Sequence, residues 1–326
     1  MTVTSAIKAS REKVDASPGE FDVRLDLVHG GSETLSISYE LVGGEDAPLL
    51  LVAGGISAGR HVLSSESDSR DGWWQSQSGV LGRCRLLSVD WLGADGNLDR
   101  PIDAADQARV FVATLDHLRI EKANGFVGAS YGAMVGLHLA SIAPERICAL
   151  LAISGADRAH PFSSALRAVQ RQAIELGEEL GSPERGVALA RKLAILSYRT
   201  PQEFEKRFEA PAAVRGGRAF ASAEQYLDHM GEKHSGRMSP AAYRRLSESI
   251  DLHWIDPANI AVPSTFVAVH GDQLVPIATI EALARAVPNG RFVGLHSLYG
   301  HDAFLKEDRA IADVIRNFLN SLEQMN

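Results

Sequence analysis

The chain has 326 residues, a length that fits one large α/β domain or two modest ones. It carries 33 Lys and Arg against 41 Asp and Glu, a formal charge of −8, so it lacks the basic excess with which a general nucleic-acid binder displaces counterions from phosphates. The 45% hydrophobic content allows a sizeable core. Because aromatic residues make up only 6% of the chain, that core is expected to be mainly aliphatic. The composition therefore predicts a globular protein that does not bind nucleic acid.

The N-terminal segment, residues 1–20, is polar and without periodicity, and we expect it to be a loose tail. It lacks the apolar centre of a signal peptide, and no apolar run reaches the roughly 20 residues of a membrane helix. Two cysteines, Cys84 and Cys148, are too few for a disulfide framework, and no Cys/His cluster has the spacing of a zinc site. We therefore expect a cytoplasmic protein without membrane contact and without a metal.

The first two strands are expected to pair at the edge of a sheet. Residues 21–28 and 35–41 alternate apolar and polar side chains, as half-buried strands do. Gly30 and Gly31 lie between them and can form a turn. The pattern predicts an antiparallel pair.

Farther along, short apolar runs without alternation indicate strands that are buried on both faces. Helical patterns lie between the first of these runs, over residues 104–118 and 131–143. Such alternation of strands and helices predicts an α/β fold with a mostly parallel, doubly wound sheet. The runs are residues 49–53, 85–89, 125–127, 147–153, 264–270 and 291–295.

A long helical segment interrupts this alternation. It contains helical patterns over 162–177, 183–198 and 223–230 and no convincing strand. A helical insertion in an α/β sheet usually covers an active site. A terminal amphipathic helix is expected over 308–322. The predicted organisation is a tail of residues 1–20, an α/β core of residues 21–154 and 263–326, and a helical cap of residues 155–262.

The motif with the clearest chemical meaning is Gly128-Ala129-Ser130-Tyr131-Gly132. A buried strand leads into it and a helix rich in small residues follows, as in the strand-to-helix turn that exposes a nucleophilic serine. The alternative is a glycine-rich turn with an incidental serine. We predict that Ser130 is a nucleophile in an α/β-hydrolase fold.

A serine nucleophile needs a base, and the base needs an orienting acid. In this fold the acid and the base follow the serine along the chain. Asp272 comes directly after the strand at 264–270, and His301 follows the strand at 291–295. We predict a catalytic triad of Ser130, Asp272 and His301, whereas His138 and His270 are expected to have structural roles.

The oxyanion of an acyl-transfer intermediate needs two backbone donors. The N–H group of Tyr131, the residue after the nucleophile, is expected to be one of them. The loop after the strand at 49–53 begins Gly54-Gly55, which allows the backbone to approach closely. The N–H group of Ile56 in that loop is expected to be the second donor.

Beyond the fold, the chain resembles the homoserine O-acyltransferase (MetX-like) family of the α/β-hydrolase superfamily. The resemblance covers roughly residues 48 to 320. The matching features are the oxyanion loop at 51–62 with its histidine at His61, Gly72-Trp73-Trp74, the helix at 169–174, the cap positions Tyr226, Leu227, Gly231, Lys233, Arg237, Tyr243, Leu246 and Asp251, and the pair His301-Asp302.

This resemblance implies a ping-pong transfer of an acetyl or succinyl group from acyl-CoA to L-homoserine in methionine biosynthesis, with no permanently bound cofactor. Arg171 matches the family's Arg-Gln-Ala-Ile helix and is expected to bind the amino-acid carboxylate by a bidentate pairing. Asp302, next to the base, is expected to bind the ammonium group. The resemblance also implies a homodimer formed through the cap.

The chain departs from the family near the acyl pocket. Gly54 stands where the family commonly has histidine, and Tyr131 where it commonly has methionine. These departures leave open whether the donor is acetyl-CoA or succinyl-CoA and whether the acceptor is homoserine or serine. A serine esterase with the same triad is a further alternative, and a catalytically inactive binding protein is disfavoured because all three triad residues are present.

Overall fold

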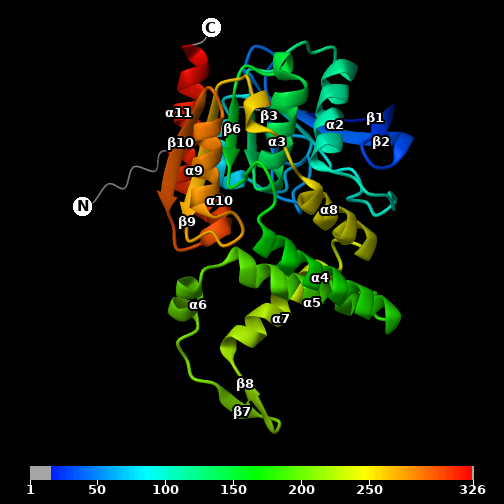
Figure 1. Ribbon diagram of the computed structural model, residues 1–326, viewed down its shortest axis with the longest axis vertical. Helices are drawn as coiled ribbons and strands as arrows, with labels where there is room; N and C mark the ends of the chain where they lie inside the picture. The colour runs from blue at the N-terminus through cyan, green and yellow to red at the C-terminus, as the bar shows by residue number, and fades with distance from the viewer. Residues whose placement is uncertain (1–15, 325–326) are drawn as a thin grey trace, which may run out of the picture.

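A computed structural model of the protein describes residues 16–324. Its centre is an eight-stranded sheet in the order β1-β2-β4-β3-β5-β6-β9-β10 (Figure 1). The first two strands are antiparallel, β2 is antiparallel to β4, and all later neighbours are parallel. The strands are β1 (Ala16–Leu27), β2 (Gly31–Val42), β3 (Leu49–Ala53), β4 (Arg85–Val89), β5 (Gly125–Ala129), β6 (Leu150–Ile153), β9 (Ser264–His270) and β10 (Gly290–His296).

The predicted antiparallel edge pair is confirmed, but it begins earlier than expected. β1 starts at Ala16, so residues 16–20 are strand rather than tail, and residues 1–15 lie outside the described part of the chain. Pro18 sits opposite Glu40 in the ladder. Proline lacks a backbone donor and is tolerated on an edge strand, where pairing with β2 outweighs the weak strand propensity of this segment.

Helices cover both faces of the sheet, which confirms the doubly wound arrangement. On β3, Leu51 and Ala53 pack into the same hydrophobic cluster as helices α2, α3 and α9. The alternate residues Leu50 and Val52 pack into a second cluster with α1 and α11. These helices are α1 (Ser78–Leu81), α2 (Ala104–His117), α3 (Tyr131–Ile142), α9 (Ile277–Ala286) and α11 (Asp308–Glu323), and α10 (Ala303–Lys306) precedes the last of them.

The cap, residues 155–262, leaves the sheet after β6 and returns to it at β9. Figure 1 shows α4, α5 and α7 grouped at one end of the sheet. Within the described residues, no helix is long and apolar enough to span a membrane. The cap helices are α4 (Pro161–Glu179), α5 (Pro183–Tyr198), α6 (Pro201–Arg207), α7 (Ser222–Ser235) and α8 (Pro240–Leu252), followed by the single turn η3 (Pro257–Asn259). The single helical turns outside the cap are η1 (Gln75–Gln77), η2 (Pro144–Arg146) and η4 (Gly300–Asp302).

The expectation that the cap contains no strand is wrong. A small antiparallel hairpin, β7 (Ala213–Arg215) and β8 (Arg218–Phe220), projects from it (Figure 1). Gly216 and Gly217 form its turn with φ of 55° and 76°. Strands of three residues, largely exposed, are too short for the alternation that indicates a strand in sequence.

Candidate active site

Ser130 occupies the turn between β5 and α3, with φ of 55°. This left-handed conformation is unusual for a residue other than glycine and is maintained by the surrounding packing. A Cβ atom at Gly128 would lie 2.4 Å from the Gly132 carbonyl oxygen, and one at Gly132 would lie 2.2 Å from the Ala53 carbonyl oxygen. Only glycine fits at these two positions, which explains why the motif needs both.

The structure brings the three predicted triad residues into one hydrogen-bonded chain. The Ser130 Oγ atom lies 2.7 Å from His301 Nε2, and His301 Nδ1 lies 2.8 Å from Asp272 Oδ2. Because the carboxylate can only accept, Nδ1 carries the imidazole proton and Nε2 accepts from the serine hydroxyl. This arrangement allows Ser130 to transfer its proton to His301.

Asp272 is held by its own backbone turn after β9. Its Oδ1 atom accepts hydrogen bonds from the N–H groups of Leu274 at 2.9 Å and Val275 at 3.0 Å. The Asp272 side chain is fully buried, and its other oxygen bonds to His301. Both carboxylate oxygens therefore have partners, so the orientation of the His301 ring is fixed.

Burial and charge act in opposite directions on His301. Burial alone lowers the pKa of its imidazole, but the charge and hydrogen bond of Asp272, with a smaller contribution from Asp302, raise it above 6.5. The imidazolium that forms when His301 takes a proton is thereby stabilised.

The predicted oxyanion donors, Ile56 and Tyr131, both line the cavity that contains Ser130. Their N–H groups make no hydrogen bond to any described residue, so both can bind a substrate oxygen. The loop carrying Ile56 is tied to α3, because the Gly132 N–H group donates to the Gly54 carbonyl at 2.8 Å. The Tyr131 side chain is buried, and its hydroxyl hydrogen-bonds to Ser249 of α8.

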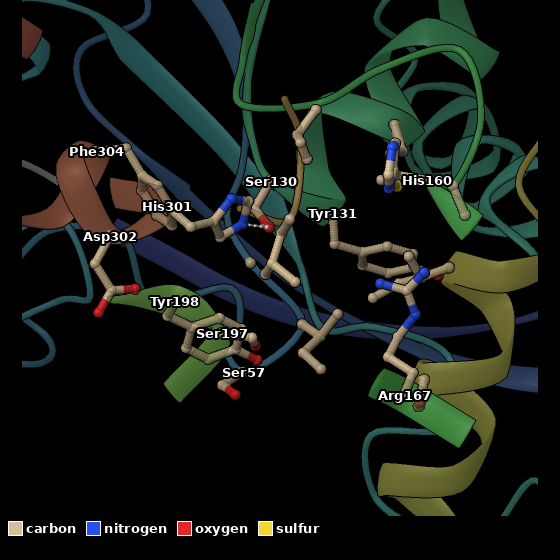
Figure 2. A pocket seen from close by; sticks show the side chains of 18 of the residues that line it. Ser57, Ser130, Tyr131, His160, Arg167, Ser197, Tyr198, His301, Asp302 and Phe304 are labelled. Carbon is tan, nitrogen blue, oxygen red and sulfur yellow. Dashed lines mark hydrogen bonds between the residues drawn. The ribbon is translucent and has the colours of Figure 1, made fainter. Parts of the chain in front are cut away.

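The cavity lies between the sheet edge and the cap, and Figure 2 shows the side chains that line it. Asp302 lines it beside His301, as expected. Its carboxylate forms an ion pair of 2.8 Å with Arg199. Burial raises the pKa of Asp302 above 3.8, although Arg199, His301 and Arg191 act to lower it.

The structure does not place Arg171 in this cavity. Its Nη1 atom bonds to Asp251 Oδ2 at 2.7 Å and to Ser247 Oγ at 3.0 Å, both on α8. The expectation that Arg171 binds the substrate carboxylate is therefore not supported by its position. Packing of α4 against α8 pairs this arginine with Asp251 instead.

Three arginines line the cavity: Arg158 after β6, Arg167 on α4 and Arg191 on α5. The Arg158 side chain is 65% exposed, whereas that of Arg167 is 10% exposed. The Arg191 guanidinium lies 5.4 Å from the centre of the Tyr198 ring, and its buried Nε atom lacks a hydrogen-bond partner. Neither Arg167 nor Arg191 was assigned a role in the sequence analysis. The available signals were helical spacings: Arg167 precedes Arg171 by four residues, and Arg191 precedes Tyr198 by seven.

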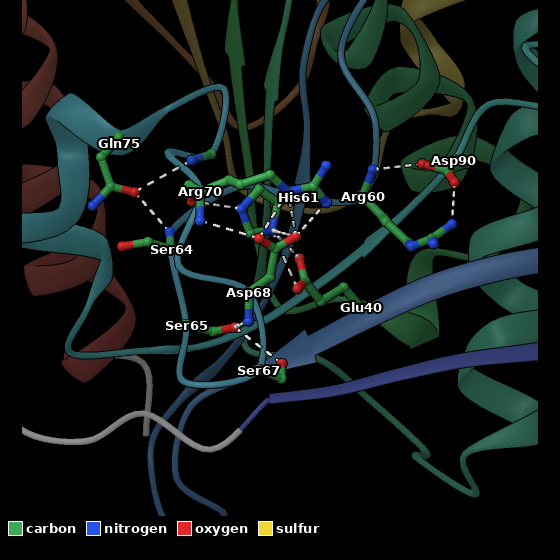
Figure 3. Close-up of polar contacts among 11 residues, drawn as sticks. Glu40, Arg60, His61, Ser64, Ser65, Ser67, Asp68, Arg70, Gln75 and Asp90 are labelled. Atoms are coloured by element: carbon green, nitrogen blue, oxygen red, sulfur yellow. Dashed lines mark hydrogen bonds and ion pairs between the residues drawn. The ribbon is translucent and has the colours of Figure 1, made fainter.

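His61, the histidine of the predicted oxyanion loop, lies outside the cavity in a charged cluster (Figure 3). Its Nδ1 atom is 3.0 Å from Glu40 Oε2, and its Nε2 atom is 2.9 Å from the Arg70 carbonyl oxygen. Both partners present acceptor oxygens, so an imidazolium ring, with a proton on each nitrogen, satisfies both contacts. Burial raises the pKa of Glu40 above 4.5, and interactions with Arg70 and Glu40 raise that of His61 above 6.5 despite burial.

This cluster supports the loop that carries Ile56. The Arg60 N–H group donates to Asp90 Oδ1 at 2.8 Å, and its guanidinium pairs with the same carboxylate. Together with the bonds of His61, these contacts join the loop after β3 to β2 and to the end of β4. Their role is structural support beneath the oxyanion loop.

Comparison with known proteins agrees with this geometry. Residues 47–308 match the α/β hydrolase fold family. A homoserine O-succinyltransferase from Xanthomonas campestris pv. campestris is 49% identical over 94% of this chain and 86% of its own length. A homoserine O-acetyltransferase from Thermus thermophilus is 32% identical over 77% of this chain and 72% of its own length.

Among solved structures, a homoserine O-acetyltransferase from Staphylococcus aureus has a TM-score of 0.80 at 22% identity, covering 94% of this chain and 96% of that one. This likeness supports the fold. The family resemblance inferred from the sequence motifs is confirmed by the closer relatives. The chain belongs to the homoserine O-acyltransferase (MetX-like) family of the α/β-hydrolase superfamily and is an enzyme of that acyltransferase type.

Proposed function

We propose that this enzyme transfers an acyl group from acyl-CoA to the side-chain hydroxyl of L-homoserine, a step in methionine biosynthesis. The observation that supports this most directly is the Ser130–His301–Asp272 chain in a cavity that is lined by charges of both signs. An amino acid carries an ammonium and a carboxylate on one carbon, so its site needs an anion and a cation close together. Asp302 and Arg191 both line the cavity and supply one charge of each sign.

In the first half-reaction, His301 Nε2 accepts the proton of Ser130, and Oγ attacks the thioester carbon. The N–H groups of Ile56 and Tyr131 stabilise the oxyanion. The carbon–sulfur bond then breaks, and His301 gives its proton to the leaving sulfur. The result is an acyl-serine and free CoA.

In the second half-reaction, homoserine enters with its carboxylate on Arg191 and its ammonium on Asp302. His301 takes the proton of its hydroxyl, whose oxygen attacks the acyl carbon. The bond to Ser130 breaks, and His301 returns the proton to Ser130 Oγ. Arg191 replaces Arg171 in this proposal because it lines the cavity and has a buried nitrogen without a partner.

A grid of two donors and two acceptors tests the proposal. CoA release is measured with acetyl-CoA and succinyl-CoA, each with homoserine, with serine and without an acceptor. The proposal expects sustained release that depends on homoserine. Equal release without any acceptor identifies an esterase-like hydrolase, preference for serine identifies a serine acyltransferase, and no release with either donor contradicts the proposal.

A further inference from the structure

The junction between α5 and α6 fixes the cap to the two loops that carry the acid and the base of the triad. The Thr200 hydroxyl donates to the Leu298 carbonyl at 2.5 Å, on the loop that leads to His301. The Gln273 side-chain amide, on the loop after β9, donates to the Arg199 carbonyl at 3.4 Å. The backbone at Arg199 is therefore fixed beside both loops, which limits where its side chain can reach.

The Arg199 side chain lies behind the cavity wall. It is 8% exposed and is not among the residues that line the cavity, whereas Asp302 lines it (Figure 2). The Arg199 Nε atom is 2.8 Å from Asp302 Oδ2, an ion pair whose alignment falls short of a hydrogen bond. Its Nη1 atom donates to Glu203 Oε1 at 2.7 Å. The guanidinium thus joins a carboxylate that lines the cavity to one that does not.

Glu203 is a buried carboxylate on α6. Its Oε2 atom has no hydrogen-bond partner among the described residues. A second cation, the exposed Arg207, lies farther away, with its Nη1 atom 3.6 Å from Glu203 Oε1. Burying a carboxylate is unfavourable unless a nearby cation compensates it, and Arg199 is the buried cation in contact with it. Glu203 and Arg199 therefore form a neutral pair outside the cavity.

The balance of charges shows what Glu203 adds to the site. Asp302 and Arg199 alone would be neutral together and would attract a further cation only weakly. Two carboxylates and one guanidinium give a net charge of −1, and the Asp302 carboxylate is the part that lines the cavity. Such charges interact over several Å when they are partly buried. The three side chains together therefore suit one monovalent cation in the cavity.

Arg199 also affects the ionisation of Asp302. Burial raises the pKa of the Asp302 carboxyl, and the charge of Arg199 is the strongest influence in the opposite direction. The Tyr198 hydroxyl, whose pKa burial raises, is neutral and adds no charge. Arg199 therefore does most to keep Asp302 charged. Weaker influences in the same direction come from His301, Arg191 and Lys306.

We propose that Arg199 and Glu203 are positioning residues that act through Asp302: Arg199 keeps its carboxylate charged and in place, and Glu203 offsets the arginine so that Asp302 still attracts the ammonium group of the acceptor. Neither side chain touches the acceptor. This inference rests on the proposed function, in which Asp302 binds that ammonium group. It assigns part of the recognition of the acceptor to side chains outside the cavity.

The first test compares homoserine with 4-hydroxybutyrate, which has the same hydroxyl and carboxylate but no ammonium group. The ratio of kcat/KM for the two acceptors is measured in mildly alkaline solution, with succinyl-CoA or acetyl-CoA, whichever gives the larger burst of CoA release. Glu203→Gln should lower the preference for homoserine at least about 10-fold, because the net charge behind the acceptor site falls to zero. The burst itself, which precedes the acceptor, should change less than about threefold.

Glu205→Gln is the matched control. It removes a carboxylate from the same helix, but this side chain is exposed. It should change the preference for homoserine less than about twofold, because an exposed charge is screened by solvent.

The second test uses pH, because the two single variants should have opposite effects. Both half-reactions need neutral His301, so the rate of deacylation by homoserine divided by the rate of acylation reports the titration of Asp302. This quotient should fall in acid as Asp302 takes a proton. Arg199→Gln removes the cation that lowers the pKa of Asp302, so the midpoint should move to higher pH. Glu203→Gln leaves Asp302 as the main partner of Arg199, so the midpoint should move to lower pH.

Removal of one partner from a buried ion pair can unfold a protein, so the melting temperature of each variant is measured. The double variant, Arg199→Gln with Glu203→Gln, removes both charges of the pair, and Asp302 alone restores the net charge of −1. In alkaline solution it should recover part of the preference for homoserine that Glu203→Gln loses. If the single variants do not fold, a double variant that retains most of this preference supports the inference.

Two results would overturn the inference. One is an equal loss with both acceptors in Glu203→Gln, which would show a general structural role. The other is a double variant that prefers homoserine no more than Glu203→Gln does or, where the single variants do not fold, one that has lost the preference.

The same measurements separate this inference from the proposed function. If homoserine accepts the acyl group but its preference over 4-hydroxybutyrate does not depend on Glu203, the inference is wrong and the proposed function stands. If homoserine does not accept the group from the wild-type protein, both are wrong.

Discussion

The sheet edge and the cap contribute to the cavity in different ways. At the sheet edge, the reactive atoms of Ser130, His301 and Asp272 are all joined in one chain of hydrogen bonds. On the cap side, Arg191 Nε and His160 Nδ1 are buried without partners. The site of proton transfer is complete without substrate, whereas the cap retains donors that a substrate can satisfy. This difference indicates that the core carries the chemistry and the cap carries the selectivity.

The largest effect is expected at the nucleophile. Ser130→Ala should lower CoA release at least about 10⁴-fold, because no other group in the chain of hydrogen bonds can form the acyl intermediate. The binding of acyl-CoA, measured by calorimetry, should persist. Substantial turnover by this variant would refute the assignment of chemistry to the sheet edge.

A change in the cap should affect the acceptor instead. Arg191→Gln should lower kcat/KM for homoserine about 30- to 1000-fold, since a buried carboxylate would lose its charged partner. The pre-steady-state burst of CoA release should remain, because it precedes the binding of homoserine. A lost burst with an unchanged KM for homoserine would contradict the proposed division of roles.

The pH dependence of the acylation rate tests the triad at the sheet edge and requires no change in the cap. His301 acts as a base only when neutral, and the charge of Asp272 overcomes burial to raise its pKa above 6.5. The rate of acylation should therefore rise about tenfold per pH unit up to a midpoint above 6.5 and then level off. In Asp272→Asn the midpoint should move to lower pH, because the charge that raises the pKa is gone. An unchanged midpoint in this variant would exclude the charge of Asp272 as the cause of the raised pKa of His301.

The smallest effect is expected in the free energy of unfolding, at the charged cluster of His61 and Glu40 that supports the oxyanion loop. His61→Ala leaves the buried Glu40 carboxylate without its charged partner and should lower the free energy of unfolding by about 1–3 kcal/mol near neutral pH. The loss should shrink in acid as Glu40 becomes protonated, at a pKa that burial raises above 4.5. It should also shrink in alkali as His61 in the wild-type protein loses its proton, at a raised pKa above 6.5.

Denaturant unfolding at a series of pH values measures this difference. The control is Arg70→Ala, which removes an exposed side chain from the same cluster but keeps the carbonyl that His61 binds. It should change the free energy of unfolding much less than His61→Ala does, because an exposed ion pair contributes little. A pH-independent loss in His61→Ala would show that packing, rather than the charge pair, is what His61 contributes.

The core could be predicted from sequence because its signals are local. The buried strand before Ser130 and the two glycines around it require the observed turn, as the close approach at Gly132 shows. Asp272 and His301 follow strands of one parallel sheet, and the carboxyl ends of such strands meet at one edge. The expected strands at 49–53, 85–89 and 264–270 match the structure residue by residue.

The cap was harder to predict because its hairpin is too short for a clear pattern and because its helix contacts are not local in sequence. The short hairpin of β7 and β8 is stabilised by its turn and cross-strand pairing, which leave little periodicity in the sequence. Asp251 was noted only as a family position, yet it determines the bonding of both Arg167 and Arg171. Such a contact between α4 and α8 depends on how two helices pack, and the spacing along either helix does not reveal it.

By itself, the sequence determined the fold class, the order of the elements and the three side chains at the sheet edge, because backbone geometry and strand order leave those residues few alternatives. Only the tertiary structure decided which of the two arginines on α4 lines the cavity. Arg167 and Arg171 are four residues apart and lie on nearly the same side of α4, so periodicity cannot distinguish them. The packing of α8 distinguishes them, because Asp251 and Ser247 hold Arg171 outside the cavity and leave one nitrogen of Arg167 available to it.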